Sequence, residues 1–342
     1  MKETKPTMIG VSPATLTGKP RNPYVKLIVI IILLLAPYVL TQLGLSFEIY
    51  FIAFLCIFSI VALGLDIIVG LSGMVSIGHA SLFGVGAYSV GIVCATHGFP
   101  FWVGMIVGIL LTTVIATLMG IPALKVEGPY LALLTIGFGW VIYLFLVNAS
   151  GITRGWNGIY GIERPALFGI SLSEDWAFTT FTVAVLIACY FLYKNISYSR
   201  FGRALRAMRE EELAALSLGI DTRLYKIMAF GLSGIFAGLA GSLFAFQLTY
   251  LSPVSFDFGL SVDFLSFLII GGIGTVFGPI VGTFALYTLV EYFFSAYSQY
   301  RFFLYGFSII LVLFFVPGGI VGASKDLLHS IQRRSRRSSS NP

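Results

Sequence analysis

Ionisable side chains are rare inside the long apolar segments of this chain; those that fall there are Asp66, His79, Glu291 and Asp263. A charge within the hydrocarbon of a bilayer is costly, so such residues mark transport pathways, proton relays or structural hydrogen bonds. Asp66 and His79 flank a glycine-rich interruption at 70–79 and could face a pathway. For His79, a hydrogen-bonded structural role is the alternative to a proton relay. These residues are too few to form the relay of a proton-driven pump.

Two serines stand in a GxSG pattern, within GLSG at 70–73 and again at 231–234. This pattern is the nucleophile motif of rhomboid intramembrane proteases, whose serine needs a histidine base from another helix. His79 follows Ser72 closely within one short segment and precedes Ser233, whereas His329 lies in the C-terminal tail. An intramembrane serine protease therefore stays a remote alternative.

The sequence does not predict ATP hydrolysis by this chain. Lys19 is followed by Pro20, and Pro13 occupies the place of the first glycine of a P-loop. We also expect no metal or cofactor, because the cysteines lie in apolar runs without metal-ligand spacing: Cys56, Cys94 and Cys189. Any energy for transport must come from another protein.

The elements that position these residues are long apolar helices. Of the 342 residues, 57% are hydrophobic and only 11% are charged, and the mean hydropathy is +0.93. Continuous apolar runs of about 20 residues can each cross a bilayer core of roughly 30 Å, and they exclude the alternating strands of a barrel. We predict an all-α polytopic membrane protein with about ten transmembrane segments, at 25–44, 49–70, 76–97, 101–122, 129–148, 176–193, 227–248, 260–275, 279–297 and 301–318.

Basic residues gather in an N-terminal tail (1–24), a loop (194–226) and a C-terminal tail (321–342), set around a transmembrane domain at 25–320. The positive-inside rule places all three in the cytoplasm, and the even numbers of segments between them agree. The alternative is that a re-entrant pair of segments replaces two of the crossings. The net charge of +6 follows this distribution and does not indicate a nucleic-acid partner. Membrane lipid is the expected partner of the basic C-terminal tail.

Two glycine-rich stretches interrupt apolar segments in the two halves of the chain. The first contains Gly73, Ser76 and Gly78, and the second contains Gly272 and Gly274. Paired interruptions point to a transport pathway, because broken helices expose backbone dipoles to a substrate. We therefore name these residues, with Asp66 and His79, as candidates for the pathway. The alternative is that both stretches are ordinary tight turns at the membrane surface.

The loop at 194–226 carries seven of the 21 Lys and Arg residues. Within it, residues 210–218 predict a short helix that acidic residues begin and Gly219 ends, in agreement with the helix dipole and with left-handed C-terminal glycines. A small-side-chain face would dock into a groove on a soluble partner, and the alternative is a helix lying on the membrane. The residues assigned to this coupling are Glu210, Glu211, Glu212, Ala214, Ala215 and Gly219.

Sequence blocks of one family run in order along residues 50–320. They are GLD at 64–66, SIGHASLFGVGAY at 76–88, YLALLT at 130–135, GFG at 137–139, TRGWNGI at 153–159, FGRALRAMRE at 201–210, AALSLGI at 214–220 and GGIG at 271–274. In this order they resemble the LivM-type permease subunits of ABC importers for branched-chain, hydrophobic amino acids. The chain departs from the pattern at Arg154, where glycine is usual, at Trp140, where glutamate is frequent, and at Leu213, where importers generally carry glutamate.

The resemblance implies translocation of branched-chain or hydrophobic amino acids by alternating access across a bacterial inner membrane. It implies four kinds of partner: a second homologous permease, two ATP-binding subunits that use the ATP, an extracytoplasmic substrate-binding protein and membrane lipid. The 210–219 helix would be the coupling helix, and Asn157 of the TRGWNGI block joins the candidate pathway residues. The chain itself would not be an enzyme. Importers of urea and short amides share this architecture, so that substrate class stays open.

Overall fold

The computed structural model describes residues 23–126, 128–164, 166–167, 170–294, 299–316 and 318–324. Most of both predicted basic tails lies outside these residues. The helices that correspond to the ten predicted segments are α1 (Pro23–Gln42), α2 (Ser46–Asp66), α3 (His79–Val90), α4 (Phe101–Gly120), α5 (Pro129–Asn148), α7 (Asp175–Tyr198), α10 (Thr222–Leu248), α11 (Phe258–Gly271), α12 (Gly278–Tyr287) and α13 (Arg301–Phe315).

Eight helical stretches within the described residues are long and apolar enough to cross a membrane. α1 adds a shorter apolar run, and α12 continues into a π-helical turn at Thr288–Phe293. Two further π-helical turns extend α2 at Ile67–Leu71 and α3 at Gly91–Thr96. The prediction of an all-α polytopic membrane protein is confirmed.

Short polar residues fix where several helices begin. The side chain of Ser199 accepts a hydrogen bond from the amide of Gly202 at 3.2 Å at the start of α8 (Arg200–Glu210). Asp221 and Asp257 cap α10 and α11 in the same way, at 3.2 Å and 3.1 Å. Each cap supplies an acceptor to an amide that the first helical turn leaves free.

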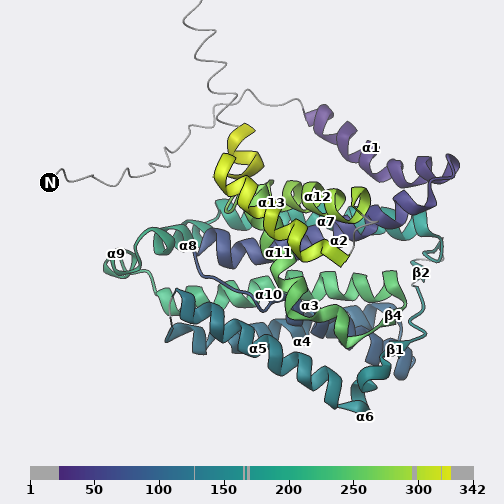
Figure 1. Cartoon of the computed structure of the whole chain (residues 1–342), viewed down its shortest axis with the longest axis horizontal. Coiled ribbons are helices and arrows are strands. Elements are labelled where there is room, and N and C mark those ends of the chain that lie inside the picture. Colours follow the sequence, from purple (N-terminus) through teal and green to yellow (C-terminus); the bar gives the residue numbers. More distant parts are fainter. Residues whose placement is uncertain are drawn as a thin grey trace, which may run out of the picture.

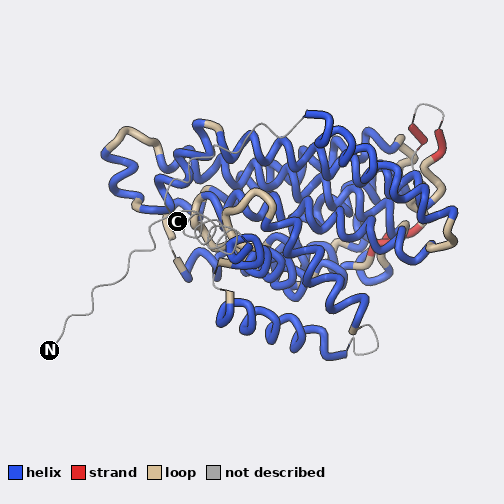
Figure 2. Tube along the Cα trace, turned by 90° about the horizontal axis from the view of Figure 1, so that it is seen from above, coloured by secondary structure: helices blue, strands red, loops and turns tan. Residues whose placement is uncertain are grey.

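The molecule has two distinct ends (Figures 1 and 2). At one end, here called the loop end, α8 and α9 (Glu212–Ser217) project from the helix bundle. At the opposite hairpin end lie α6 (Ser150–Thr153) and four two-residue strands. These strands form two antiparallel pairs, β1 (Ile159–Tyr160) with β4 (Tyr250–Leu251) and β2 (Ala166–Leu167) with β3 (Ile170–Ser171).

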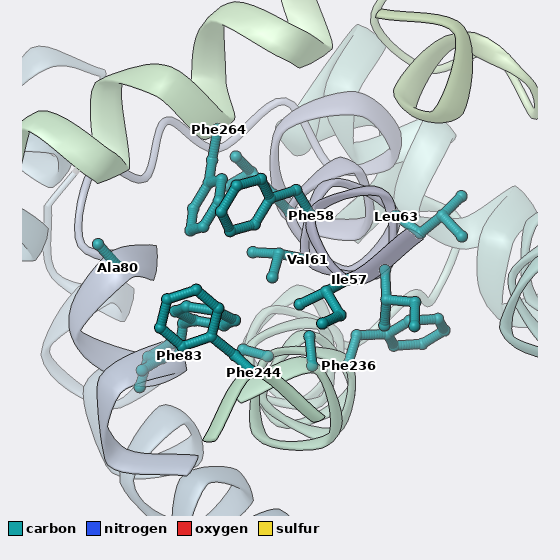
Figure 3. Close-up of a cluster of buried hydrophobic side chains, with 14 of the residues drawn as sticks. Ile57, Phe58, Val61, Leu63, Ala80, Phe83, Phe236, Phe244 and Phe264 are labelled. Carbon is teal, nitrogen blue, oxygen red and sulfur yellow. The ribbon is translucent and has the colours of Figure 1, made fainter. Parts of the chain in front are cut away.

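Helix α10 is central to the bundle and packs against α2, α3 and α4. Figure 3 shows apolar side chains that meet between these helices and α11, among them Phe58, Phe83, Phe244 and Phe264. The rings of Phe83 and Phe244 lie 4.9 Å apart, and those of Phe58 and Phe264 lie 5.6 Å apart. This dense packing holds the interrupted segments in place.

Glycines let the backbones of α4 and α10 approach each other closely. A methyl group added at Gly238 would lie 2.9 Å from the α-carbon of Ile109, and one added at Gly234 would lie 2.6 Å from the β-carbon of Ala116. Small residues at such spacing promote helix association in lipid, where the hydrophobic effect gives no drive between helices. The GxxxG pattern at 234–238 therefore serves packing.

Candidate functional site

The two glycine-rich interruptions meet inside the bundle, although they are far apart in sequence. The carboxylate of Asp66, at the end of α2, accepts a hydrogen bond from the amide of Gly274 at 2.8 Å. It also accepts one from the hydroxyl of Tyr193 on α7. Asp66 is 0% exposed, and a buried carboxylate is tolerated only where donors surround it. Asp66 thus joins the second interruption to α7, and Gly70, at the start of the first interruption, lies against its carboxylate.

The non-helical part of the first interruption, residues 72–78, is largely buried, apart from the exposed Gly73. The amide of Ile77 donates to the hydroxyl of Thr135 on α5 at 3.0 Å, and the amide of Ala80 donates to the hydroxyl of Ser261 on α11, also at 3.0 Å. Non-helical backbone at membrane depth persists only where the protein or a wet cavity satisfies its polar groups. Here side chains of α5 and α11 do so, which an exposed surface turn would not need.

His79 bridges two helices through hydrogen bonds. Its Nδ1 lies 3.0 Å from the hydroxyl of Ser76, and its Nε2 lies 2.6 Å from the hydroxyl of Ser233 on α10. A neutral imidazole has one donor and one acceptor nitrogen, so one serine donates and the other accepts. The serine of the second GxSG pattern, Ser233, is therefore in contact with His79, although His79 precedes it in the sequence. All three side chains are buried, however, so the geometry favours the structural role of His79.

The second interruption needs glycine for its backbone shape. Gly272 and Gly274 have φ angles of +112° and +75°, values that other residues rarely adopt. The hydroxyl of Thr275 donates to the carbonyl of Gly272 at 2.8 Å and closes the turn. Gly272 is buried, and Gly274 is partly exposed. The turn thereby directs the Gly274 amide toward Asp66.

A side chain from the loop reaches both interruptions. Nη1 of Arg209, on α8, donates to the carbonyl of Gly70 at 2.5 Å. A methyl group added at Gly274 would lie 3.0 Å from the same nitrogen, and one added at Gly73 would lie 2.7 Å from Cγ of Arg209. Gly73 is exposed and borders a cavity of about 160 Å³ that Arg209 also lines. In the sequence, Arg209 is only one of the seven basic residues of the loop at 194–226.

The loop helix differs from its prediction at the N-terminal end. Glu210 is the last residue of α8, and the extended backbone of Glu211, with φ −159° and ψ 110°, separates α8 from α9. α9 then runs from Glu212 to Ser217, and Gly219 follows with the predicted positive φ of +80°. Both carboxylate oxygens of Glu212 lie 2.7 Å from Nζ of Lys226, which ties α9 to α10.

The surface that α9 offers also differs from the predicted one. Ala215 is 1% exposed and packs against the rest of the chain, so in this structure it does not face a partner. Leu213 and Leu218 are 72% and 80% exposed, and Ala214 is exposed beside them. Leu216, also on α9, is exposed too, so the outward surface of α9 and of Leu218 just beyond its end is made chiefly of leucine. A helix of six residues is too short for the spacing of its side chains to reveal which face packs inward.

Asn157 lies apart from the other candidate pathway residues. It sits, exposed, in a helical turn at Gly155–Asn157 at the hairpin end, whereas Asp66 and Gly274 lie beside Arg209 of the loop end. The neighbouring Arg154 adopts a left-handed backbone, with φ 61°, and its guanidinium lies 5.0 Å from the centre of the Tyr160 ring. The structure thus assigns Asn157 to the surface of the hairpin end.

A small cavity borders the first interruption on the side of α5. Ile77 and Ser81 form one wall, and the aromatic residues Trp140, Tyr143 and Phe258 form part of the others. Its volume of about 20 Å³ is that of a single water-sized site. In the described part of the chain, no group of three or more His, Cys, Asp or Glu side chains is placed to hold a metal ion.

Comparisons with known proteins identify the family of the chain. Residues 47–313 match the family described as "Branched-chain amino acid transport system / permease component". The chain belongs to this permease family. It is 32% identical over 295 residues to the high-affinity branched-chain amino acid transport system permease protein LivM of Escherichia coli K12, covering 80% of this chain and 69% of LivM.

Two further relatives show the breadth of the family. The LivH permease protein of E. coli K12 is 27% identical over 288 residues, which cover 78% of this chain and 91% of LivH. The autoinducer 2 import system permease protein LsrC of Yersinia pseudotuberculosis is 28% identical over 240 residues, 66% of this chain and 64% of LsrC. No solved structure matches the chain. Family membership places the chain among permeases and not among intramembrane proteases.

Sequence reasoning missed two residues of this site. Tyr193 lies in an ordinary apolar helix, and nothing in its spacing separates it from the other tyrosines of the chain. Arg209 had a signal, because it directly precedes the three glutamates of the loop. Its position directly before the predicted loop helix was readable, but its contact with Gly70, 139 residues away, was not.

Proposed function

We propose that this chain is the membrane-spanning subunit of an ABC importer that moves branched-chain or other hydrophobic amino acids by alternating access. The observation that carries the proposal is the meeting of the two interruptions at Asp66 and Gly274. Alternating access needs segments that can move against each other around a substrate route, and interrupted helices in the two halves of a transporter provide them. The names of the relatives supply the substrate class.

The loop end would lie in the cytoplasm and bind two ATP-hydrolysing subunits. Four arginines of α8 face this end, in keeping with the positive-inside rule: Arg200, Arg203, Arg206 and Arg209. The exposed leucines of α9 form an apolar surface that a groove on a soluble subunit could cover. Leucines that face lipid are already in an apolar environment, whereas leucines that face water form an apolar patch, and such a patch marks a site of protein interaction.

The substrate route would run along α5 and the first interruption, facing a second, homologous permease. Ile77 and Ser81 already border a cavity there, and aromatic side chains of α5 and Phe258 supply an apolar wall. An apolar wall beside a few polar groups suits the side chain of a hydrophobic amino acid. The hairpin end, which carries Asn157 and Arg154, would face the substrate-binding protein outside the bacterial inner membrane.

The proposal can be tested with the complete complex. A tagged form of this chain is purified from native membranes with its associated subunits, reconstituted into liposomes and supplied with ATP and the binding protein. We expect ATP-dependent uptake of labelled leucine that is lost when this chain is omitted. Labelled urea serves as the comparison substrate. Uptake of urea without uptake of leucine would assign the alternative substrate class, and uptake of leucine without this chain would overturn the proposal.

A further inference from the structure

Arg209 stands out among the arginines of α8 because its hydrogen bond reaches an element far away in the sequence. Arg203, Arg206 and Arg209 all lie on α8, and each donates to a backbone carbonyl. Arg203 and Arg206 bind carbonyls at the nearby end of α7, five and nine residues away. Arg209 binds the carbonyl of Gly70, 139 residues away, in the π-helical turn that follows α2.

The Gly70 carbonyl lies directly beside the joint between the two interruptions. A methyl group at Gly70 would overlap the carboxylate of Asp66 and would lie 2.7 Å from the amide of Gly274. That amide is the one that donates to Asp66 at 2.8 Å. Arg209, Gly70, Asp66 and Gly274 therefore pack together: one hydrogen bond joins Arg209 to Gly70, another joins Gly274 to Asp66, and Gly70 lies against the Asp66 carboxylate between them.

Arg209 is also placed to sense a displacement of α9. Only Glu210 separates it from Glu211, whose extended backbone connects α8 to α9. α9 cannot move far without its neighbours, because Glu212 is paired with Lys226 on α10 and Ala215 is buried. A push on the exposed leucines of α9 must therefore shift α8 and α10 as well, and the shift of α8 carries Arg209 with it.

We infer that Arg209 is a positioning residue that transmits movement of the α8–α9 loop to both glycine-rich interruptions through the Gly70 carbonyl. The inference rests on the proposed importer function and adds the residue that links ATP hydrolysis to opening of the membrane segments. A charged donor forms a stronger hydrogen bond than a neutral one, so the bond from Arg209 can carry a displacement. Arg209 makes this bond to Gly70, at the start of the first interruption. If the contact only stabilised the fold, its loss would lower the melting temperature without lowering the uptake per ATP of the folded complex.

The test separates coupling from folding and from docking. In the reconstituted complex, Arg209→Met should lower leucine uptake about tenfold, a loss of about 1.4 kcal/mol. ATP hydrolysis, association of the ATP-binding subunits and the melting temperature should stay near wild type, so that uptake per ATP falls. Arg209→Lys keeps a cationic donor and should restore part of the uptake. Arg203→Met is the matched control, since it removes another exposed arginine of α8 whose hydrogen bond is local.

A second measurement follows the interruption itself. In a background without native cysteines, Ile77→Cys should react with a polar thiol reagent at rates that differ between ATP-bound and nucleotide-free complexes. Adding Arg209→Met should remove this difference, whereas adding Arg203→Met should keep it.

Unchanged uptake per ATP in Arg209→Met would overturn the inference while the importer function stands. An equal loss of uptake, hydrolysis and subunit association would also overturn it, by assigning Arg209 to docking. Absence of leucine uptake by the wild-type complex would instead refute the proposed function.

Discussion

Replacing Leu213 of α9 and Leu218, the residue just beyond its C-terminal end, with serine should detach the ATP-binding subunits while the membrane helices stay folded. Leu213 and Leu218 are 72% and 80% exposed in the chain alone. Full burial of a leucine side chain contributes about 1.5–3 kcal/mol. Scaled by the exposed fractions, docking can gain about 2.3–4.6 kcal/mol from the pair, so the double variant should bind about 50-fold more weakly or worse.

Two measurements check this prediction. Binding of the purified ATP-binding subunits to the chain in lipid nanodiscs gives the dissociation constant, and thermal unfolding of the same samples reports the fold. Leu224→Ser is the control, because Leu224 is 51% exposed near the same end but belongs to α10. If the double variant binds as tightly as the wild type, the leucine surface of α9 is not the docking site.

The buried position of Ala215 changes what a substitution there can reveal. Ala215→Glu would place a carboxylate at a site that is 1% exposed, next to the ion pair of Glu212 and Lys226. Burying an unpaired charge is strongly unfavourable. We therefore expect this variant to lower thermal stability together with subunit binding, so it cannot distinguish docking from packing, whereas the leucine pair can.

Three further outcomes follow from the contacts. Asp66→Ala leaves the Tyr193 hydroxyl and the Gly274 amide without this acceptor and should destabilise the protein by about 2 kcal/mol or more, whereas Asp66→Asn keeps an acceptor and should cost less, as thermal unfolding will show. Gly238→Ala forces a methyl group to within 2.9 Å of α4 and should cost about 1–3 kcal/mol, while Gly137→Ala, in open space, should be neutral; equal melting temperatures would contradict the packing argument. A cysteine at Ile77, beside the cavity, should react with polar thiol reagents faster than one at the buried Ser76, and equal rates would argue against a route along this wall.

Much of the fold could be predicted because the membrane imposes it. Each predicted apolar run, such as 129–148, corresponds to a helix, since in lipid only a helix satisfies its own backbone. The interruption at 271–278 could also be predicted, because a backbone with positive φ angles requires glycine and the glycines are visible in the sequence. Local signals of this kind survive in a single sequence.

The contacts of the candidate site could not be predicted in the same way. The bond between Asp66 and Gly274 joins residues 208 positions apart, and no periodicity carries information over such a distance. The loop helix was misplaced because Glu210 and Glu211 favour a helix start by charge, whereas Ser199 caps an earlier helix that already includes Glu210. Asn157 was grouped with the pathway through a family motif, which suggests a role but does not fix a position.

The π-helical turn at Ile67–Leu71, which contains Gly70, has a further consequence for the segment that follows it. A π-helical turn accommodates one more residue than an α-helical turn of the same kind. If that turn rewound to α-helix, the surplus residue would pass into the segment that follows and rotate it by about 100° relative to α2, while advancing it by about 1.5 Å. The turn thus holds a reserve of chain length next to Asp66, which allows the first interruption to change its facing direction without breaking the core around Phe58 and Phe83.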